Sequence, residues 1–136
     1  MGFYRRKNNI IIPFEYKLIR NFHEGLAVVK VEGKLAFINI KNEIVIKPKF
    51  KYYYSSGFYE GLSLVRSDEG KFGYIDKQGN IIIETIYDYA TKFNNGFSVV
   101  GLDNLYGLIN REGVVVLPIK HTSLIDYENT NYKFTE

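Results

Sequence analysis

The pattern of apolar and polar residues along this chain repeats itself. The segment Gly2-Phe3-Tyr4 has counterparts in Ala36-Phe37-Ile38, Gly73-Tyr74-Ile75 and Gly107-Leu108-Ile109, at steps of 34, 37 and 34 residues. A fixed period of this length, with the same residue classes in the same columns, is typical of a repeat architecture. The sequence therefore predicts four successive copies of one small unit.

Each copy contains the signals of about three short strands. Short aliphatic and aromatic runs, such as 72–75 and 81–83, are separated by polar turn residues, which favours a β-hairpin. Asn8 falls in the column of Gly79 and Gly113, so this column is where we expect a positive φ. A second glycine column, Gly25, Gly61 and Gly96, leads into the third strand of each copy, and no segment has a helical period with caps.

We therefore predict an all-β fold. It consists of four tandem repeats of about 35 residues, each with about three short antiparallel strands, in one domain over 1–136. The expected repeats are about 1–33, 34–70, 71–104 and 105–136, and the last is degenerate because it lacks the glycine and most of the aliphatic residues of its third strand. An open, twisted or solenoid-like array is the expected shape. A closed β-barrel is the alternative, because closure removes exposed strand edges.

The apolar columns of the repeat predict the core. We assign to it the columns Phe22, Phe58 and Phe93; Val28, Leu64 and Val99; and Ile38, Ile75 and Ile109. A single copy buries too little surface to be stable alone, so neighbouring copies must supply the missing face. Five glycines are also expected to be structural repeat positions: Gly25, Gly61, Gly96, Gly73 and Gly107.

A polar column, Asn39, Asp76 and Asn110, stands beside the predicted hairpin turns. Short polar side chains at such places usually accept hydrogen bonds from nearby backbone. We expect that role here. The alternative is a ladder of ligand contacts.

Composition narrows the class of protein. The chain has 136 residues, 46% of them hydrophobic, with 22 Tyr and Phe, no Trp and no Cys. This apolar content supports a real core, and the absence of cysteine excludes disulfides. The longest apolar runs are far too short to span a bilayer, and no secretory signal is recognised. We expect no membrane association and, by default, a cytoplasmic location.

Charge is distributed unevenly, and this suggests a binding patch. Residues 1–68 contain 12 Lys and Arg against 6 Asp and Glu, whereas residues 69–136 contain 6 against 9. Three lysines, Lys47, Lys49 and Lys51, precede Tyr52, Tyr53 and Tyr54, and Arg5 and Arg6 lie in the same basic half. Exposed tyrosines give contact area at low entropic cost. Alternatively, these rings simply pack on their own repeat.

Nothing in the sequence indicates catalysis or a cofactor. The two histidines, His23 and His121, fall in unrelated repeat positions, whereas a zinc site needs more ligands at closer spacing. We find no phosphate-binding glycine loop, no Ser-x-x-Lys and no G-x-S-x-G motif. We therefore expect no enzyme activity, no metal and no cofactor.

The repeat resembles a known family. The pattern that starts at Phe72-Gly73-Tyr74 and continues through Tyr87 and Phe93 to Val100 is similar to the WG-repeat proteins, named for a Trp-Gly pair. Here the Trp column holds Met1, Leu35, Phe72 and Tyr106, and the Gly column holds Ala36 in one copy. The resemblance implies a β-rich interaction region of a kind widespread in bacteria, without known catalytic residues.

Two functions follow as expectations. The first is a non-catalytic module for protein–protein binding or self-assembly through the repeat surface. The second is a binder of an anionic polymer, nucleic acid or acidic glycan, through the basic, Tyr-rich first half.

Overall fold

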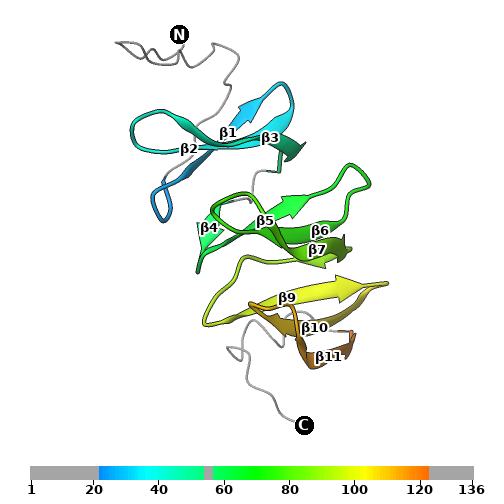
Figure 1. Cartoon of the computed structure of the whole chain (residues 1–136). Helices are drawn as coiled ribbons and strands as arrows, with labels where there is room; N and C mark the ends of the chain where they lie inside the picture. The colour runs from blue at the N-terminus through cyan, green and yellow to red at the C-terminus, as the bar shows by residue number, and fades with distance from the viewer. Residues whose placement is uncertain (1–21, 54–56, 123–136) are drawn as a thin grey trace.

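The computed structural model describes residues 22–53 and 57–122, and these contain strands and turns but no helix. Three antiparallel meanders, each of three longer strands, lie one above the other in an open stack (Figure 1), and the second and third each have one additional strand of two residues. The predicted all-β, open array is confirmed, and the barrel alternative is wrong because the described sheets stay open. The strands are β1 (Ala27–Val31), β2 (Lys34–Ile38) and β3 (Ile44–Lys51); β4 (Phe58–Tyr59), β5 (Leu62–Arg66), β6 (Phe72–Ile75) and β7 (Ile81–Tyr87); β8 (Tyr89–Ala90), β9 (Phe97–Leu102), β10 (Leu105–Asn110) and β11 (Val115–His121).

The meanders are offset from the repeat copies predicted from the sequence. Strand β1 lies in the copy 1–33 and β2 in the copy 34–70, yet they pair along their whole length, from Ala27 with Ile38 to Val31 with Lys34. Each meander thus joins the third strand of one copy to the first two strands of the next. Adjacent meanders meet at two places: Lys51 at the end of β3 pairs with Arg66 of β5, and Tyr89 of β8 pairs with Gly101 of β9. Because of this offset, each described meander contains strands from two successive copies.

The glycines at 25, 61 and 96 form two-residue hairpin turns with the residue before them. Glu60 and Gly61 both have positive φ, 55° and 83°, and the pairs at 24–25 and 95–96 match them. Two successive positive φ angles define the turn that fits the twist of a β-hairpin. No atom comes within 4 Å of a Cβ built on Gly61, so backbone conformation alone is the reason for glycine there.

Gly73 and Gly107 are needed for a different reason, which is a bulge in the strand opposite. Phe72 pairs with Tyr87 and Tyr74 with Ile83, so two residues of β6 face four of β7. The bulged backbone presses on the glycine: a Cβ on Gly73 would lie 2.4 Å from the Ile83 carbonyl oxygen. Gly107 meets the same bulge in β11, at 2.4 Å from the Leu117 carbonyl oxygen, whereas β2 carries a buried Ala36 at this position.

The two largest core clusters lie between the meanders, and the first two strands of each meander are largely buried on both faces. In β5, for example, Leu64 packs toward the third meander and Val65 toward the first. The predicted core columns of Val28, Leu64 and Val99 and of Ile38, Ile75 and Ile109 are at most 2% exposed. The positions that hold Trp in the family, Leu35 and Phe72, are also buried, at 2% and 8% exposure.

The aromatic column confirms the core prediction at two of its three members. Phe58 lies 4.7 Å from the Phe37 ring of the meander above it, and Phe93 lies 4.8 Å from the Tyr74 ring. Both are almost fully buried. The prediction for Phe22 is wrong, since its side chain is 41% exposed. The column packs on the second strand of the preceding meander, and within the described residues no meander precedes Phe22.

Candidate interaction surface

The three lysines predicted as a binding patch lie together on β3. Strand alternation directs Lys47, Lys49 and Lys51 outward, while Ile46 and Phe50 point inward. The backbone and side chains of 45–50 form one wall of an open groove of about 400 Å3, and Gln78 and Gly79 form the other. Residues 22–53 contain six lysines and three glutamates, so this part of the array is basic.

The tyrosines do not extend this patch outward. Tyr52 is half-buried against the core between the first and second meanders, with the Lys30 ammonium 5.3 Å from its ring centroid. Tyr53 turns to the next core and packs edge-on to Phe72, with ring centroids 5.0 Å apart. The interpretation in which the rings pack within the array therefore describes these two. Tyr54, Arg5 and Arg6 lie outside the described residues.

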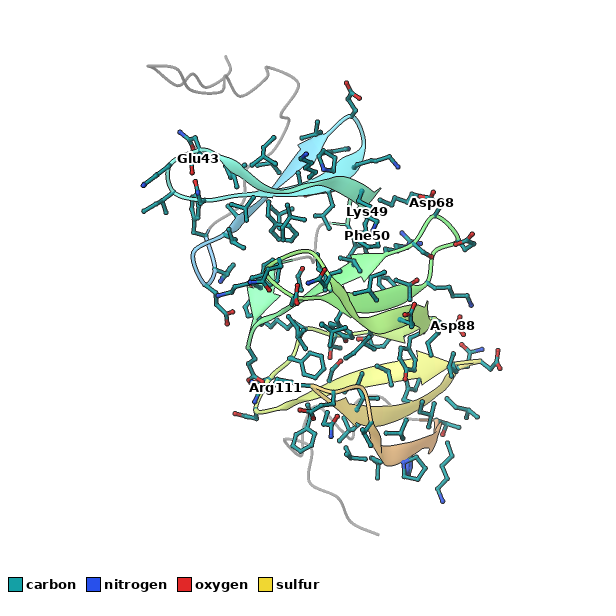
Figure 2. All side chains as sticks on the ribbon, in the orientation of Figure 1. Glu43, Lys49, Phe50, Asp68, Asp88 and Arg111 are labelled. Carbon is teal, nitrogen blue, oxygen red and sulfur yellow. The ribbon has the colours of Figure 1, made fainter. Side chains whose placement is uncertain are left out.

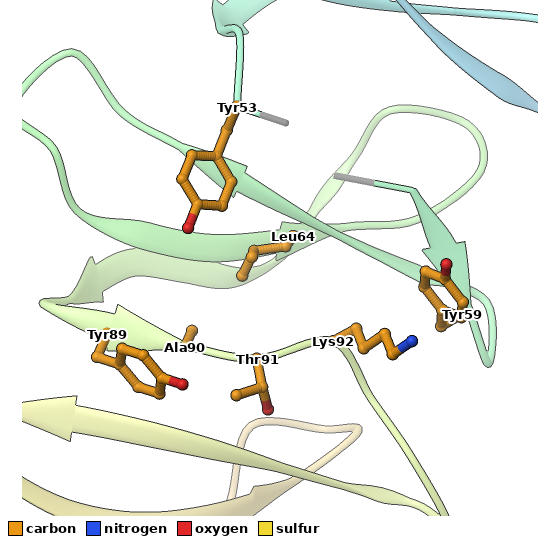
Figure 3. Close-up of a pocket in the computed structure, with 7 residues that line it drawn as sticks. All are labelled: Tyr53, Tyr59, Leu64, Tyr89, Ala90, Thr91 and Lys92. Carbon is orange, nitrogen blue, oxygen red and sulfur yellow. The ribbon is translucent and has the colours of Figure 1, made fainter. Parts of the chain in front are cut away.

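A second hollow lies between the second and third meanders. It has a volume of about 370 Å3 and its walls come from Tyr53, Tyr59, Leu64, Tyr89, Ala90, Thr91 and Lys92. Figure 3 shows Lys92 extended toward Tyr59, and its Nζ is 4.4 Å from the centre of that ring. The Tyr59 hydroxyl is 3.0 Å from Nε2 of His23. This hollow could not be predicted from the sequence, because its residues come from two copies of the repeat that only stacking brings together.

The most regular exposed feature is an aliphatic column on the third strand of each meander, β3, β7 and β11. It was not predicted from the sequence. Val45, Ile82 and Val116 occupy equivalent positions in β3, β7 and β11 and are 43%, 44% and 38% exposed. Further exposed aliphatic residues lie beside them: Ile81, Ile86, Val114 and Val115. Irregular pairing near Ile82 breaks the alternation of β7, so that two successive isoleucines face outward.

We call this region the third-strand surface: the exposed side chains of β3, β7 and β11. In Figure 2, Lys49 at the end of β3 and Asp88 just after β7 lie toward the same side of the stack. Runs of three aliphatic residues, at 81–83 in β7 and at 114–116 where β11 begins, were the available sequence signal. A strand has two faces, so such a run must direct at least one large apolar side chain away from the core it fills.

The polar column beside the turns is structural. Asp76 Oδ1 accepts hydrogen bonds from the backbone N–H groups of Gln78 and Asn80, both at 2.9 Å. Asn39 and Asn110 accept equivalent pairs of bonds in the other two meanders. The backbone role predicted for this column is confirmed, and its side-chain oxygens are occupied in the turn.

A second set of carboxylates ties the meanders to one another. Glu24 accepts hydrogen bonds from the backbone N–H groups of Glu60, at 2.6 Å, and Gly61, at 2.9 Å. Glu60 in turn accepts one from Gly96 at 2.8 Å. Each glutamate thus satisfies the hairpin turn of the next meander. Burial raises the pKa of Glu24, but the bonds from Gly61 and Glu60 and the nearby Lys77 ammonium outweigh it and hold the pKa below 4.5.

The pKa shifts found among the described residues come from burial and from structural contacts. The hydrogen bond with Asp88 raises the pKa of Lys71, and the same contact, with a bond from the Asp103 N–H, lowers the pKa of Asp88. Burial raises the pKa of Tyr87. These shifts, like that of Glu24, all move away from pH 7, whereas a general acid or base works best near it.

The described residues also contain no group of three or more His, Cys, Asp or Glu side chains placed to hold a metal ion. Within the same ranges, no helix has the length and apolar character needed to cross a bilayer. The regular features that remain are surfaces: the lysines of β3, the aliphatic column and the tyrosine-lined hollow.

Comparison with known proteins agrees with the repeat seen in the structure. The profile of the family described as "WG containing repeat" matches three times, over residues 1–34, 36–71 and 72–106. These matches follow the first three predicted copies closely, and no match covers the fourth. A search of curated proteins finds no significant match. Since the three matches together span most of the sequence, the chain belongs to the WG-repeat family.

Proposed function

We propose that this protein is a non-catalytic interaction module that binds protein through the third-strand surface. The observation that carries the proposal is the column of Val45, Ile82 and Val116, which places an exposed aliphatic side chain at the same point of three successive meanders. Scattered apolar side chains are normal on any surface, but a contiguous apolar patch marks an interaction site. A rim of lysines and carboxylates around this column has the composition of a protein interface.

Site-specific photo-crosslinking tests this proposal. A photoreactive phenylalanine at position 82 should give defined protein adducts, either with a second copy or with another protein of the source cell. The same probe at Ile40, which is 76% exposed on a turn away from the column, is the matched control and should give none. Equal adduct yields at both positions, or no adduct at position 82, would refute the proposed surface.

A second candidate is binding of an anionic polymer, and the three outward lysines of β3 favour it. Such binding weakens steeply with salt because each contact releases counterions. An electrophoretic shift of single-stranded nucleic acid at low salt, lost in Lys47→Glu and retained in Lys41→Glu, would support it. A chain that causes no shift at low salt excludes nucleic acid.

A further inference from the structure

We propose that the third-strand surface binds a second copy of this chain. The two copies meet face to face about a two-fold axis that runs along the strands, midway between β3 and β7. This inference rests on the proposed function and specifies its partner. A two-fold interface requires a surface that is complementary to itself, and the arrangement of β3 and β7 meets this requirement.

The exposed charges of β3 and β7 are complementary to each other. Lys47 of β3 and Glu84 of β7 occupy the same column of the repeat, and both side chains are exposed. Lys51 and Asp88 share another column, again exposed and again of opposite sign. A two-fold axis between the strands places each column of β3 on the same column of β7 in the second copy. Both columns then pair a lysine with a carboxylate, twice in each dimer.

Lys47 and Glu84 are suited to this because neither forms an ion pair within residues 22–53 and 57–122, where the two salt bridges are Lys71 with Asp88 and Lys77 with Glu24. Opposite charges across an interface set its register and disfavour other partners. Asp88 already contacts Lys71, so the Lys47 and Glu84 column is the more specific one for a test.

The exposed aliphatic residues of β3 and β7 also match each other. The same axis places Val45 on Ile82 of the second copy, so that two side chains, each more than 40% exposed in the single chain, are covered. Ile86 faces the aliphatic stem of Lys49 in the same way, since these two residues share a column. Burial of apolar surface supplies the favourable free energy, and the flanking charges supply the register.

The mode of contact follows from how these strands are built. Pro48 interrupts β3 and Pro118 interrupts β11, and bulges interrupt all three third strands. Prolines and bulges prevent a sheet edge from accepting another strand. The second copy therefore binds through side chains packed face to face, and not through added backbone hydrogen bonds.

The size of the surface sets the expected strength. Strands of seven or eight residues at about 3.3 Å each, on two sheets about 10 Å apart, cover about 500 Å2 per copy. The total of about 1,000 Å2 is at the lower limit for a specific interface. We therefore expect dimerisation in the micromolar range, visible between about 1 and 200 μM.

Sedimentation velocity over that range tests the inference through charge reversal. Lys47→Glu places two carboxylates in each column and Glu84→Lys places two lysines there, so each variant alone should shift the dimerisation midpoint at least tenfold upward. Mixed in equal amounts, the two variants should form a dimer again, because every column of the mixed pair is complementary. The double variant Lys47→Glu with Glu84→Lys should dimerise like the original chain.

Two controls complete the design. Ile82→Glu should abolish the dimer, whereas Ile40→Glu, on an exposed turn residue outside the surface, should leave it unchanged, with circular dichroism confirming that both variants fold. A chain that stays monomeric at 200 μM, or a dimer insensitive to these reversals, overturns the second-copy partner. If position 82 nevertheless crosslinks another protein, the interaction module stands and only its partner changes.

Discussion

Replacing Gly73 with alanine tests the packing argument on which this repeat depends. The added Cβ would lie 2.4 Å from the Ile83 carbonyl oxygen and 2.6 Å from that of Glu84. Both oxygens belong to the bulge of β7, so no side-chain rotation relieves the contact. The bulge has to move, and it carries Ile83 and Tyr87, each only 5% exposed in the core.

The magnitude follows from this displacement. Overpacking of a filled core costs about 1–3 kcal/mol, and we expect Gly73→Ala at the upper end because backbone must shift. At about 2.1 cal/mol/K per residue, a chain of 136 residues has an unfolding entropy of about 0.29 kcal/mol/K. A loss of ~3 kcal/mol then lowers Tm by about 10 °C. Urea unfolding followed by far-ultraviolet circular dichroism, together with calorimetry, measures both quantities.

The intrinsic preference of a strand for alanine over glycine predicts that Gly73→Ala increases stability, which is the opposite of the effect expected from the close contact. The φ of Gly73 is outside the left-handed region, and there alanine is favoured over glycine in a strand by about 0.5–1 kcal/mol. Ala36→Gly, at the equivalent position of β2, should show that preference as a loss of about 1–2 kcal/mol, including the buried methyl group. A Gly73→Ala variant as stable as the original chain, or more so, would refute the close-approach argument.

Three further outcomes are expected. Phe58→Ala should destabilise by ~3–5 kcal/mol in urea unfolding, because the ring is fully buried, whereas Phe22→Ala in the same column, 41% exposed, should cost less than about 1 kcal/mol; equal losses would contradict the packing assigned to the column. Tyr74→Phe should cost about 1 kcal/mol by removing the hydroxyl that bonds the Thr91 carbonyl at 2.5 Å, and an unchanged Tm would place that hydroxyl in water. The lowered pKa of Glu24 stabilises the fold above about pH 4.5, and this effect is lost as pH falls through the folded-state pKa. Glu24→Gln should therefore be less stable than the original chain at pH 7, by under about 1 kcal/mol, and the difference should shrink as the pH is lowered; a difference that does not shrink in acid would show that charge is not the cause.

Much of the fold follows from local chemistry that is legible in the sequence. Turn glycines, the Asx column at Asp76 and the alternation of β3 depend on residues a few positions apart, so they recur in each copy and can be recognised there. The two core columns that contain Val99 and Ile109 are apolar in each copy, so they too can be recognised from the repeat. In β3 the lysines at 47, 49 and 51 are exposed and alternate with more buried residues for the same local reason.

What depends on contacts between copies was not predictable. The bulge that presses on Gly73, the turn of Gly61 held by Glu24, and the exposed aliphatic column at Ile82 depend on how strands of different copies meet. Phe22 shows the converse: its residue type predicts burial, but burial requires a preceding sheet, and none lies within residues 22–53 and 57–122. The sequence by itself determined the repeat, its strands and its turns. Only the tertiary structure decided that apolar residues such as Phe22 and Ile82 face solvent and not a neighbouring meander, because that depends on stacking and not on local sequence.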